Sequence, residues 1–333
     1  MSARQGGQLS GYDEQRARVI NFGGEIDVRR GERSRARKPV LPKKSQPRLM
    51  NPIKPLHSIV SSNSLPYAKY AEFAEAAARA AGEVTLRYFQ KLPGVEYKAD
   101  RSPVTVADRE SEKLLRGRIE ERFPAHGILG EEFGLACPES RMRWLLDPID
   151  GTQSFIRGVP LYGVMLALVE DGDPVVGVVH FPALSETVVA WRGGGCWWTR
   201  GGERVRARVS NVARLEDAVL LATDPLGHQG EAKRAGYEAL KGRVKMERGW
   251  GDCYGYALVA TGRAEIMLDA ALSEWDAAPL IPILEEAGGR FTDWKGIRTI
   301  SGGDGFATNE AVYGQVMRII CGEIGKPKSP QRE

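Results

Sequence analysis

Nine consecutive residues carry the most informative pattern in this chain: Trp144-Leu145-Leu146-Asp147-Pro148-Ile149-Asp150-Gly151-Thr152. The apolar residues 144–146 predict the end of a buried strand, and Pro148 excludes a helix at that point. Gly151 permits a tight turn into a following helix. Asp147 and Asp150 are then expected in one pocket at the carboxyl end of the strand. Since Mg2+ prefers carboxylate oxygens and a helix start offers free N–H groups to anions, the segment predicts a cation site beside a phosphate site.

A bare pair of carboxylates at this spacing is more often a capped turn, but three further acidic segments accompany it. Glu131 and Glu132 follow a short apolar stretch and a glycine. Asp108 follows an extended segment and falls in the first turn of a polar helix. Asp276 opens another predicted helix, where the positive end of the helix dipole favours an acid. Each acid alone is more often a helix cap or a surface residue, so the interpretation depends on their combination.

In combination, three motifs resemble the inositol monophosphatase superfamily of Mg2+-dependent, lithium-sensitive phosphatases: Gly130-Glu131-Glu132, Asp147-Pro148-Ile149-Asp150-Gly151-Thr152 and Trp275-Asp276-Ala277-Ala278. The similarity extends from about Tyr67 to Ile320. Segments 151–163 and 251–260 are more similar to bacterial histidinol-phosphatases than to the inositol enzymes. Gln153 departs from the pattern, because many histidinol-phosphatases carry Lys or Arg there. The resemblance implies a five-layer αβαβα sandwich of the α/β (α+β) class, with the active site in a cleft between two halves.

The resemblance also implies a role for each acid. The metal ligands would be Glu131, Asp147, the carbonyl of Ile149, Asp150 and Asp276. They would hold two or three Mg2+ ions, which the substrate phosphate bridges and which activate a water molecule. Asp108 and Thr152, with Glu131, match the catalytic residues that orient and deprotonate this water. Gly151 and Thr152 would give backbone N–H groups to the phosphate, and lithium would inhibit.

Substrate choice is expected from a second segment, whose candidate residues are Arg248, Trp250, Asp252 and Tyr254. If the substrate is histidinol phosphate, Asp252 would recognise its cationic end, and Trp250 or Tyr254 would pack against its ring. Core packing explains the two aromatic residues equally well. Asp269 matches the position from which inositol enzymes contact a substrate hydroxyl.

The net charge of +4 over 333 residues is unevenly distributed. Residues 1–64 contain 13 Lys or Arg and 5 Asp or Glu, so the positive balance belongs to this segment. Its composition predicts a disordered tail, with a nucleic-acid-binding arm as the less favoured alternative. If the reading frame has been extended too far upstream, Met50 is the alternative start. The rest divides into an expected α+β half at 65–205, an α/β half at 206–325 and a disordered end at 326–333.

Periodicity predicts the main elements between these boundaries. Helices are expected at 67–92, 104–123, 252–261, 274–287 and 309–321, and strands at 163–169, 175–181 and 187–191.

The residue patterns that other phosphatase mechanisms require are incomplete in this chain. The segment 137–143 fits the C-x5-R spacing of cysteine phosphatases, but it has no glycines to wrap a phosphate and includes a proline. The four histidines form no close pair, and Gly193-Gly194-Gly195 lacks the lysine of a nucleotide-binding loop. The four scattered cysteines favour reduced thiols in a cytoplasmic protein, and no apolar run reaches the roughly 18 residues of a membrane span.

The leading hypothesis is a Mg2+-dependent phosphomonoesterase acting on L-histidinol phosphate in histidine biosynthesis. Inositol-1-phosphate or another small phosphate ester is the alternative substrate. A non-catalytic regulatory or nucleic-acid-binding protein on the same scaffold is the alternative of a different class. The five acids that the resemblance requires are all present, which favours the enzyme. The resemblance further implies a homodimer. The sequence predicts no membrane partner, and nucleic acid is the less favoured partner of the basic segment.

Overall fold

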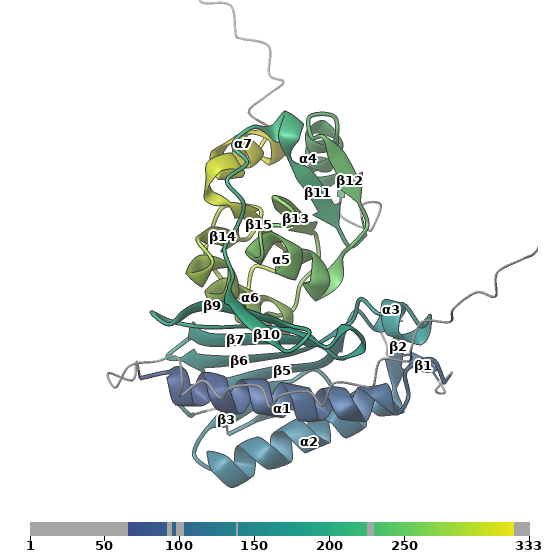
Figure 1. Ribbon diagram of the computed structural model, residues 1–333, viewed down its shortest axis with the longest axis vertical. Helices are drawn as coiled ribbons and strands as arrows, with labels where there is room; N and C mark the ends of the chain where they lie inside the picture. The colour runs from purple at the N-terminus through teal and green to yellow at the C-terminus, as the bar shows by residue number, and fades with distance from the viewer. Residues whose placement is uncertain (1–65, 92–94, 98–102, 138, 225–229, 323–333) are drawn as a thin grey trace, which may run out of the picture. The chain divides into compact units, whose positions relative to one another are not determined.

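Two large β-sheets and three helical layers alternate along the long axis of the structure (Figure 1). The strands Val95–Tyr97 and Pro103–Thr105 form a separate two-stranded sheet. The computed structural model describes residues 66–91, 95–97, 103–137, 139–224 and 230–322. These residues belong to a single unit, Met50–Glu333. The predicted basic tail 1–64, the alternative start Met50 and the end segment 326–333 lie outside the described residues. The division into halves at 65–205 and 206–325 stays a prediction.

The helices are α1 (Ala68–Leu86), α2 (Val106–Arg122), α3 (Thr152–Ile156), α4 (Gly230–Lys241), α5 (Asp252–Ala260), α6 (Glu274–Glu286) and α7 (Glu310–Ile320). The first strands are β1 (Val95–Tyr97), β2 (Pro103–Thr105), β3 (Gly127–Gly130), β4 (Gly134–Ala136), β5 (Met142–Asp150), β6 (Gly163–Glu170), β7 (Asp173–Phe181) and β8 (Glu186–Trp191). The others are β9 (Gly195–Arg200), β10 (Glu203–Arg206), β11 (Val219–Ala222), β12 (Met246–Arg248), β13 (Ile266–Asp269), β14 (Gly289–Thr292) and β15 (Gly305–Asn309).

The larger sheet has eight strands in the order β10-β9-β8-β7-β6-β5-β3-β4. Its pairs are antiparallel except β3 with β5. The smaller sheet has the order β12-β11-β13-β15-β14, with β11 parallel to both of its neighbours. Helices α1 and α2 cover one face of the larger sheet, α5 and α6 lie between the sheets, and α4 and α7 cover the smaller sheet. This arrangement is the expected five-layer αβαβα sandwich.

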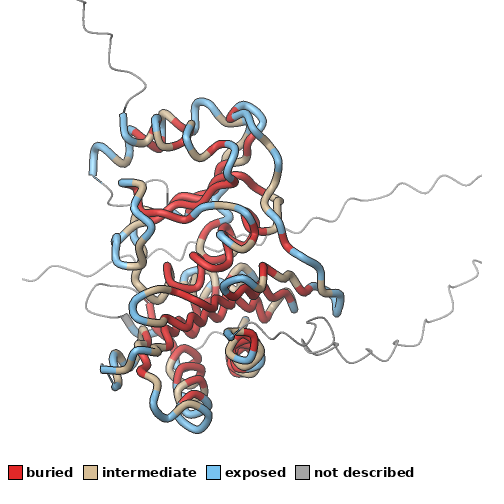
Figure 2. Tube along the Cα trace, turned by 90° about the vertical axis from the view of Figure 1, so that its left-hand side faces the viewer, coloured by how far each residue is buried: buried red, intermediate tan, exposed pale blue. Residues whose placement is uncertain are grey.

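Three large apolar clusters fill the interfaces between layers, and one of them extends from the larger sheet through α5 and α6 to the smaller sheet. Buried residues follow the two sheets and the helices between them (Figure 2). On α1, small side chains at Ala71, Ala74 and Ala78 are fully or almost fully buried, which lets the helix lie close to the sheet. On the other face of the sheet, Gly177 of β7 has no room for a side chain, because an added Cβ would overlap the carbonyl oxygen of Pro279 in α6. Close packing of α6 on the sheet therefore depends on this glycine.

The predicted helices and strands are all present, with ends shifted by a few residues. The first helix ends at Leu86, earlier than the predicted residue 92. The strand expected to end at Leu146 instead continues to Asp150, so that expectation was wrong. The pairing of β5 with β6 is irregular between Asp147 and Asp150, and Pro148 falls in this stretch, where a regular ladder N–H is not needed.

In the part of the chain that the structure describes, no helix has both the length and the apolar character that a membrane crossing requires. The predicted cytoplasmic location stays a prediction.

Candidate active site

Three aspartates meet where the larger sheet faces α6. Asp147 and Asp150 come from the end of β5, and Asp276 comes from the first turn of α6. One carboxylate oxygen from each lies within 4.8 Å of the other two. In a regular strand, residues three apart point to opposite faces, so the irregular pairing of β5 is what lets Asp147 and Asp150 share one side. The predicted meeting of these carboxylates is confirmed.

Asp276 and Asp147 are also held by the backbone. The Ser273 N–H donates to the Asp276 carboxylate at 2.8 Å, and this capping arrangement fixes the start of α6. The Ile149 N–H donates to Asp147 at 2.9 Å. These bonds restrict the rotation of both carboxylates, so the cluster is positioned before any cation enters.

Asp108 and Glu131 reach the same region from other elements. Asp108 is 1% exposed in the first turn of α2, and it accepts bonds from the backbone N–H and the hydroxyl of Thr105 at 2.8 and 2.6 Å. Glu131 follows β3, and its charge raises the pKa of Asp147 and Asp108. Glu131 is therefore an electrostatic neighbour of the cluster, and Asp108 is an electrostatic neighbour of Glu131.

Gly151 and Thr152 form the turn between β5 and α3. Gly151 has a left-handed backbone with φ of 79°, and an added Cβ would lie 3.0 Å from a carboxylate oxygen of Asp252. Glycine is favoured here by both conformation and space. The Thr152 hydroxyl donates to the carbonyl of Ile149 at 3.0 Å, which leaves the hydroxyl oxygen as an acceptor. The first backbone N–H groups of a helix have no partner within it, so this turn offers donors to the site.

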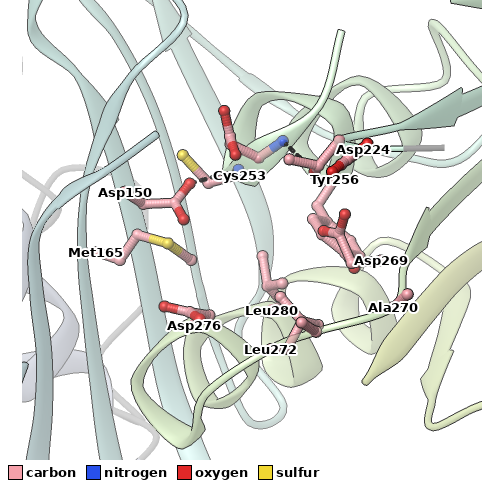
Figure 3. Close-up of a pocket in the computed structure, with 13 residues that line it drawn as sticks. Asp150, Met165, Asp224, Cys253, Tyr256, Asp269, Ala270, Leu272, Asp276 and Leu280 are labelled. Carbon is pink, nitrogen blue, oxygen red and sulfur yellow. Dashed lines mark hydrogen bonds between the residues drawn. The ribbon is translucent and has the colours of Figure 1, made fainter. Parts of the chain in front are cut away.

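A cavity of about 400 Å³ opens beside the aspartates (Figure 3). Its lining residues are Asp150, Met165, Thr223, Asp224, Asp252, Cys253, Tyr256, Asp269, Ala270, Ala271, Leu272, Asp276 and Leu280. Asp150 and Asp276 lie on one side, and Asp224 and Asp269 lie on the opposite side, at the edge of the smaller sheet. Across this cavity, the larger sheet and α6 thus face the elements of the smaller sheet.

A second cavity of about 630 Å³ lies on the other side of the turn. Its lining residues are Pro103, Glu131, Gly151, Thr152, Gln153, Ser154, Val159, Leu161, Thr223, Asp224, Gly249, Gly251 and Asp252. The two cavities share Thr223, Asp224 and Asp252. The described residues that line the two cavities include several acids and no Lys, Arg or His.

Burial and mutual repulsion raise the pKa of these carboxyl groups. Burial, followed by repulsion from Asp276, raises the pKa of Asp150 to about 7. Burial likewise raises the pKa of Asp269 to about 7, and burial with the neighbouring Asp150 raises the pKa of Asp252 to about 8. A cation would relieve this repulsion, which makes the cluster a suitable cation site.

Asp252 is positioned by its backbone as well as by its neighbours. It has a φ of 51°, which is uncommon for a residue with a side chain, at the first position of α5. Its N–H donates to the Thr223 hydroxyl at 2.8 Å, and the next N–H, of Cys253, donates to Asp150 at 2.6 Å. The start of α5 therefore holds Asp252 and Asp150 close to each other.

The other predicted substrate residues lie outside both cavity linings. Tyr254 packs against Phe181 with ring centroids 5.0 Å apart, next to the guanidinium of Arg263. Trp250 is 44% exposed, and Arg248 donates to the carbonyl of the preceding residue. The role of Arg248, Trp250 and Tyr254 in substrate binding stays a prediction, and for Tyr254 the packing is that of a core residue.

Several residues that shape the site were not found from the sequence. Thr105 holds Asp108, and Thr223 holds Asp252. The Glu112 carboxylate accepts the N–H groups of Glu132 and Phe133, and so supports the loop that carries Glu131. Thr223 and Asp224 directly follow the apolar strand β11. Polar residues at the end of a strand are the one sequence pattern that could have identified these two as site residues.

Comparison with known proteins agrees with this geometry. The Inositol monophosphatase family matches residues 67–324. A histidinol-phosphatase of Chlorobaculum parvum is 42% identical over 249 residues, which cover 74% of this chain and 93% of the relative. A histidinol-phosphatase of Mycobacterium tuberculosis is 39% identical over 224 residues, covering 67% of this chain and 86% of the relative.

The fold comparison leads to the same family. The crystal structure of extragenic suppressor protein suhB from Bartonella henselae superposes with a TM-score of 0.71 at 30% identity, and covers 76% of this chain and 98% of that chain. The family match spans the two sheets and all the residues of the aspartate cluster. The chain belongs to the inositol monophosphatase family.

Proposed function

We propose that this chain is a Mg2+-dependent phosphomonoesterase whose substrate is L-histidinol phosphate. The family supports phosphoric monoester hydrolysis, and it is metal-dependent. The choice of substrate rests on the acidic wall of the cavity, which Asp224 and Asp269 form on the side opposite Asp150 and Asp276, with Asp252 at the start of α5. Such a wall favours a leaving group that carries a positive charge, because each carboxylate can form a charge-assisted hydrogen bond.

The residues present fit a divalent cation. Asp147, Asp150 and Asp276 offer oxygen ligands within 4.8 Å of one another, and Glu131 is close enough to raise the pKa of Asp147. The carbonyl of Ile149 lies between the two β5 ligands in sequence. We assign these five groups as the ligands of two or three Mg2+ ions. When bound, Mg2+ would neutralise the phosphate and lower the pKa of a coordinated water.

The chain's own groups would then orient the reaction. The Thr152 hydroxyl, which donates to the Ile149 carbonyl, can accept a hydrogen bond from the attacking water. Asp108, whose pKa burial raises to about 7, is suited to take the proton of that water. The backbone N–H groups of Gly151 and Thr152 would bind the phosphate oxygens. No covalent enzyme intermediate is required.

The leaving group would lie in the cavity of about 400 Å³. Asp252 would bind the ammonium or the imidazolium of the substrate, and Asp269 the other of these two cationic groups. Because Asp252 carries a raised pKa, a cationic ligand would also favour its ionised form. Arg248 and Trp250 flank Gly249, which lines the second cavity, and we assign them to the rim of that cavity. A homodimer is the proposed assembly.

A phosphate-release panel tests the proposal. L-histidinol phosphate, inositol-1-phosphate, fructose-1,6-bisphosphate and 3′-phosphoadenosine 5′-phosphate are compared at equal concentration with Mg2+. We expect the highest kcat/KM for L-histidinol phosphate and no release in excess EDTA. Faster hydrolysis of inositol-1-phosphate would reject the histidinol assignment. Full activity in EDTA would reject the metal mechanism.

A further inference from the structure

A third cavity, of about 250 Å³, lies away from the aspartate cluster. It is bounded by the start of β5, the turn between β6 and β7, the first turns of α6 and the segment 298–301. Its lining residues are Arg143, Gly172, Pro174, Glu274, Ile281, Arg298, Thr299, Ile300 and Ser301. Unlike the two cavities of the active site, it contains side chains of both charges.

Arg143 is the first of these side chains. It belongs to β5, four residues before Asp147, and it is half-buried. Its Nε is buried and has no hydrogen-bond partner. A buried donor without a partner destabilises the folded protein, and more so when the group is charged. The described residues supply no ion pair to Arg143, so the cavity holds a cationic group that is not neutralised.

Glu274, the first residue of α6, is the second charged side chain of this cavity. Its carboxylate accepts the hydroxyl of Ser301. Among the residues that the structure describes, no cationic side chain pairs with Glu274. Arg298 lines the same cavity, but its guanidinium is bound to Glu285 and to Asp173, the latter at 2.8 Å.

Arg143 and Glu274 therefore face one small cavity with opposite charges, and within the described chain they do not form an ion pair with each other. A simple anion in the cavity would meet Glu274, and a simple cation would meet Arg143. A ligand with both charges satisfies each group at the same time. Ile281 and Ile300 supply an apolar wall, and Thr299 and Ser301 supply hydroxyl groups.

We propose that this cavity binds a small zwitterion of the α-amino acid class, with the carboxylate on Arg143 and the ammonium on Glu274. The site is distinct from the proposed catalytic site, since it shares no lining residue with either of the other two cavities. Its volume, about 250 Å³, is below the range for drug-sized ligands and suits a molecule of a few heavy atoms.

Binding to the full-length, metal-free protein tests this proposal without any activity measurement. A panel of free α-amino acids is screened by equilibrium dialysis, with L-alanine, propionate and ethylamine as a matched set in which the latter two lack one charge. We expect at least one amino acid to bind with a Kd below about 1 mM. Propionate and ethylamine should bind at least roughly ten-fold more weakly than L-alanine. Absence of binding by every amino acid, or equal binding of the matched set, overturns the proposal.

Variants locate the site. Arg143→Gln and Glu274→Gln should each weaken binding of the best amino acid by roughly ten-fold or more. Arg141→Gln is the matched control, because this neighbouring arginine is exposed and paired with Asp171. Asp252→Asn should bind as the unmodified protein does, and loss of binding in that variant would move the ligand to the active-site cavity and overturn the proposal. The matched ligand set retains its meaning if a variant folds poorly.

Discussion

Replacing Asp108 by asparagine should make the metal-free protein more stable while removing its activity. Asp108 is 1% exposed, and burial raises its pKa from 3.8 to about 7, against the opposing effect of two bonds from Thr105. Glu132 and Glu131 add further repulsion. Asparagine keeps an oxygen acceptor for Thr105 and carries no charge. The variant therefore isolates the cost of ionising this buried group.

The direction and the magnitude of this change in unfolding free energy follow from the shift of the Asp108 pKa. A folded-state pKa above the unfolded one gives stability that is present below about pH 4 and is lost as the pH rises through 7. A shift of about three units at 1.36 kcal/mol each corresponds to about 4 kcal/mol. Relaxation of the structure and entry of water reduce this electrostatic cost. At pH 8 the unfolding free energy of Asp108→Asn should therefore be about 2–4 kcal/mol higher than that of the unmodified protein. The two should be equal at pH 4.

Urea denaturation in EDTA at pH 4, 6 and 8 measures the effect. Asp171→Asn is the control, because Asp171 is exposed and the guanidinium of Arg141 lowers its pKa, so this variant should gain no stability at pH 8. With Mg2+, Asp108→Asn should lose roughly 10²- to 10⁴-fold in kcat, the contribution of a general base. A variant that is no more stable than the parent at pH 8 would refute the electrostatic argument. Retained activity would refute the role of Asp108 as the base.

Three further changes test the metal site, the substrate wall and the packing of α6. Asp150→Asn should abolish Mg2+-dependent phosphate release and leave the circular dichroism spectrum unchanged, because it removes one charged ligand; substantial activity would exclude Asp150 as a ligand. Asp252→Asn should lower kcat/KM for histidinol phosphate by roughly ten- to a hundred-fold and affect a neutral phosphate ester much less; equal losses would show a purely structural role. Gly177→Ala should destabilise the protein by about 1–3 kcal/mol in urea denaturation, because its Cβ would overlap the Pro279 carbonyl, and unchanged stability would show that α6 can shift freely.

The sequence by itself predicted the main elements and the acidic residues of the candidate site. The predicted α5, α6 and β6–β7 hairpin are present, and each is buried along most of its length rather than on one face. The acidic motifs predicted Asp147, Asp150 and Asp276 as one group, and the carboxylates of these residues do meet. Local pattern was sufficient for these features because short-range geometry and side-chain chemistry depend on neighbours in the chain.

Only the tertiary structure decided how distant segments complete the site. The irregular pairing of β5 with β6 places Asp147 and Asp150 on one side, and no local propensity specifies that register. Thr223 and Asp224 become cavity residues only because β11 ends beside the start of α5. The raised pKa values arise from burial and from acids more than a hundred residues away, as with Asp276 beside Asp150. Likewise Arg143 and Glu274 line one cavity because α6 packs on the larger sheet. Sequence spacing does not encode such long-range packing, so only the folded structure brings these residues to one cavity.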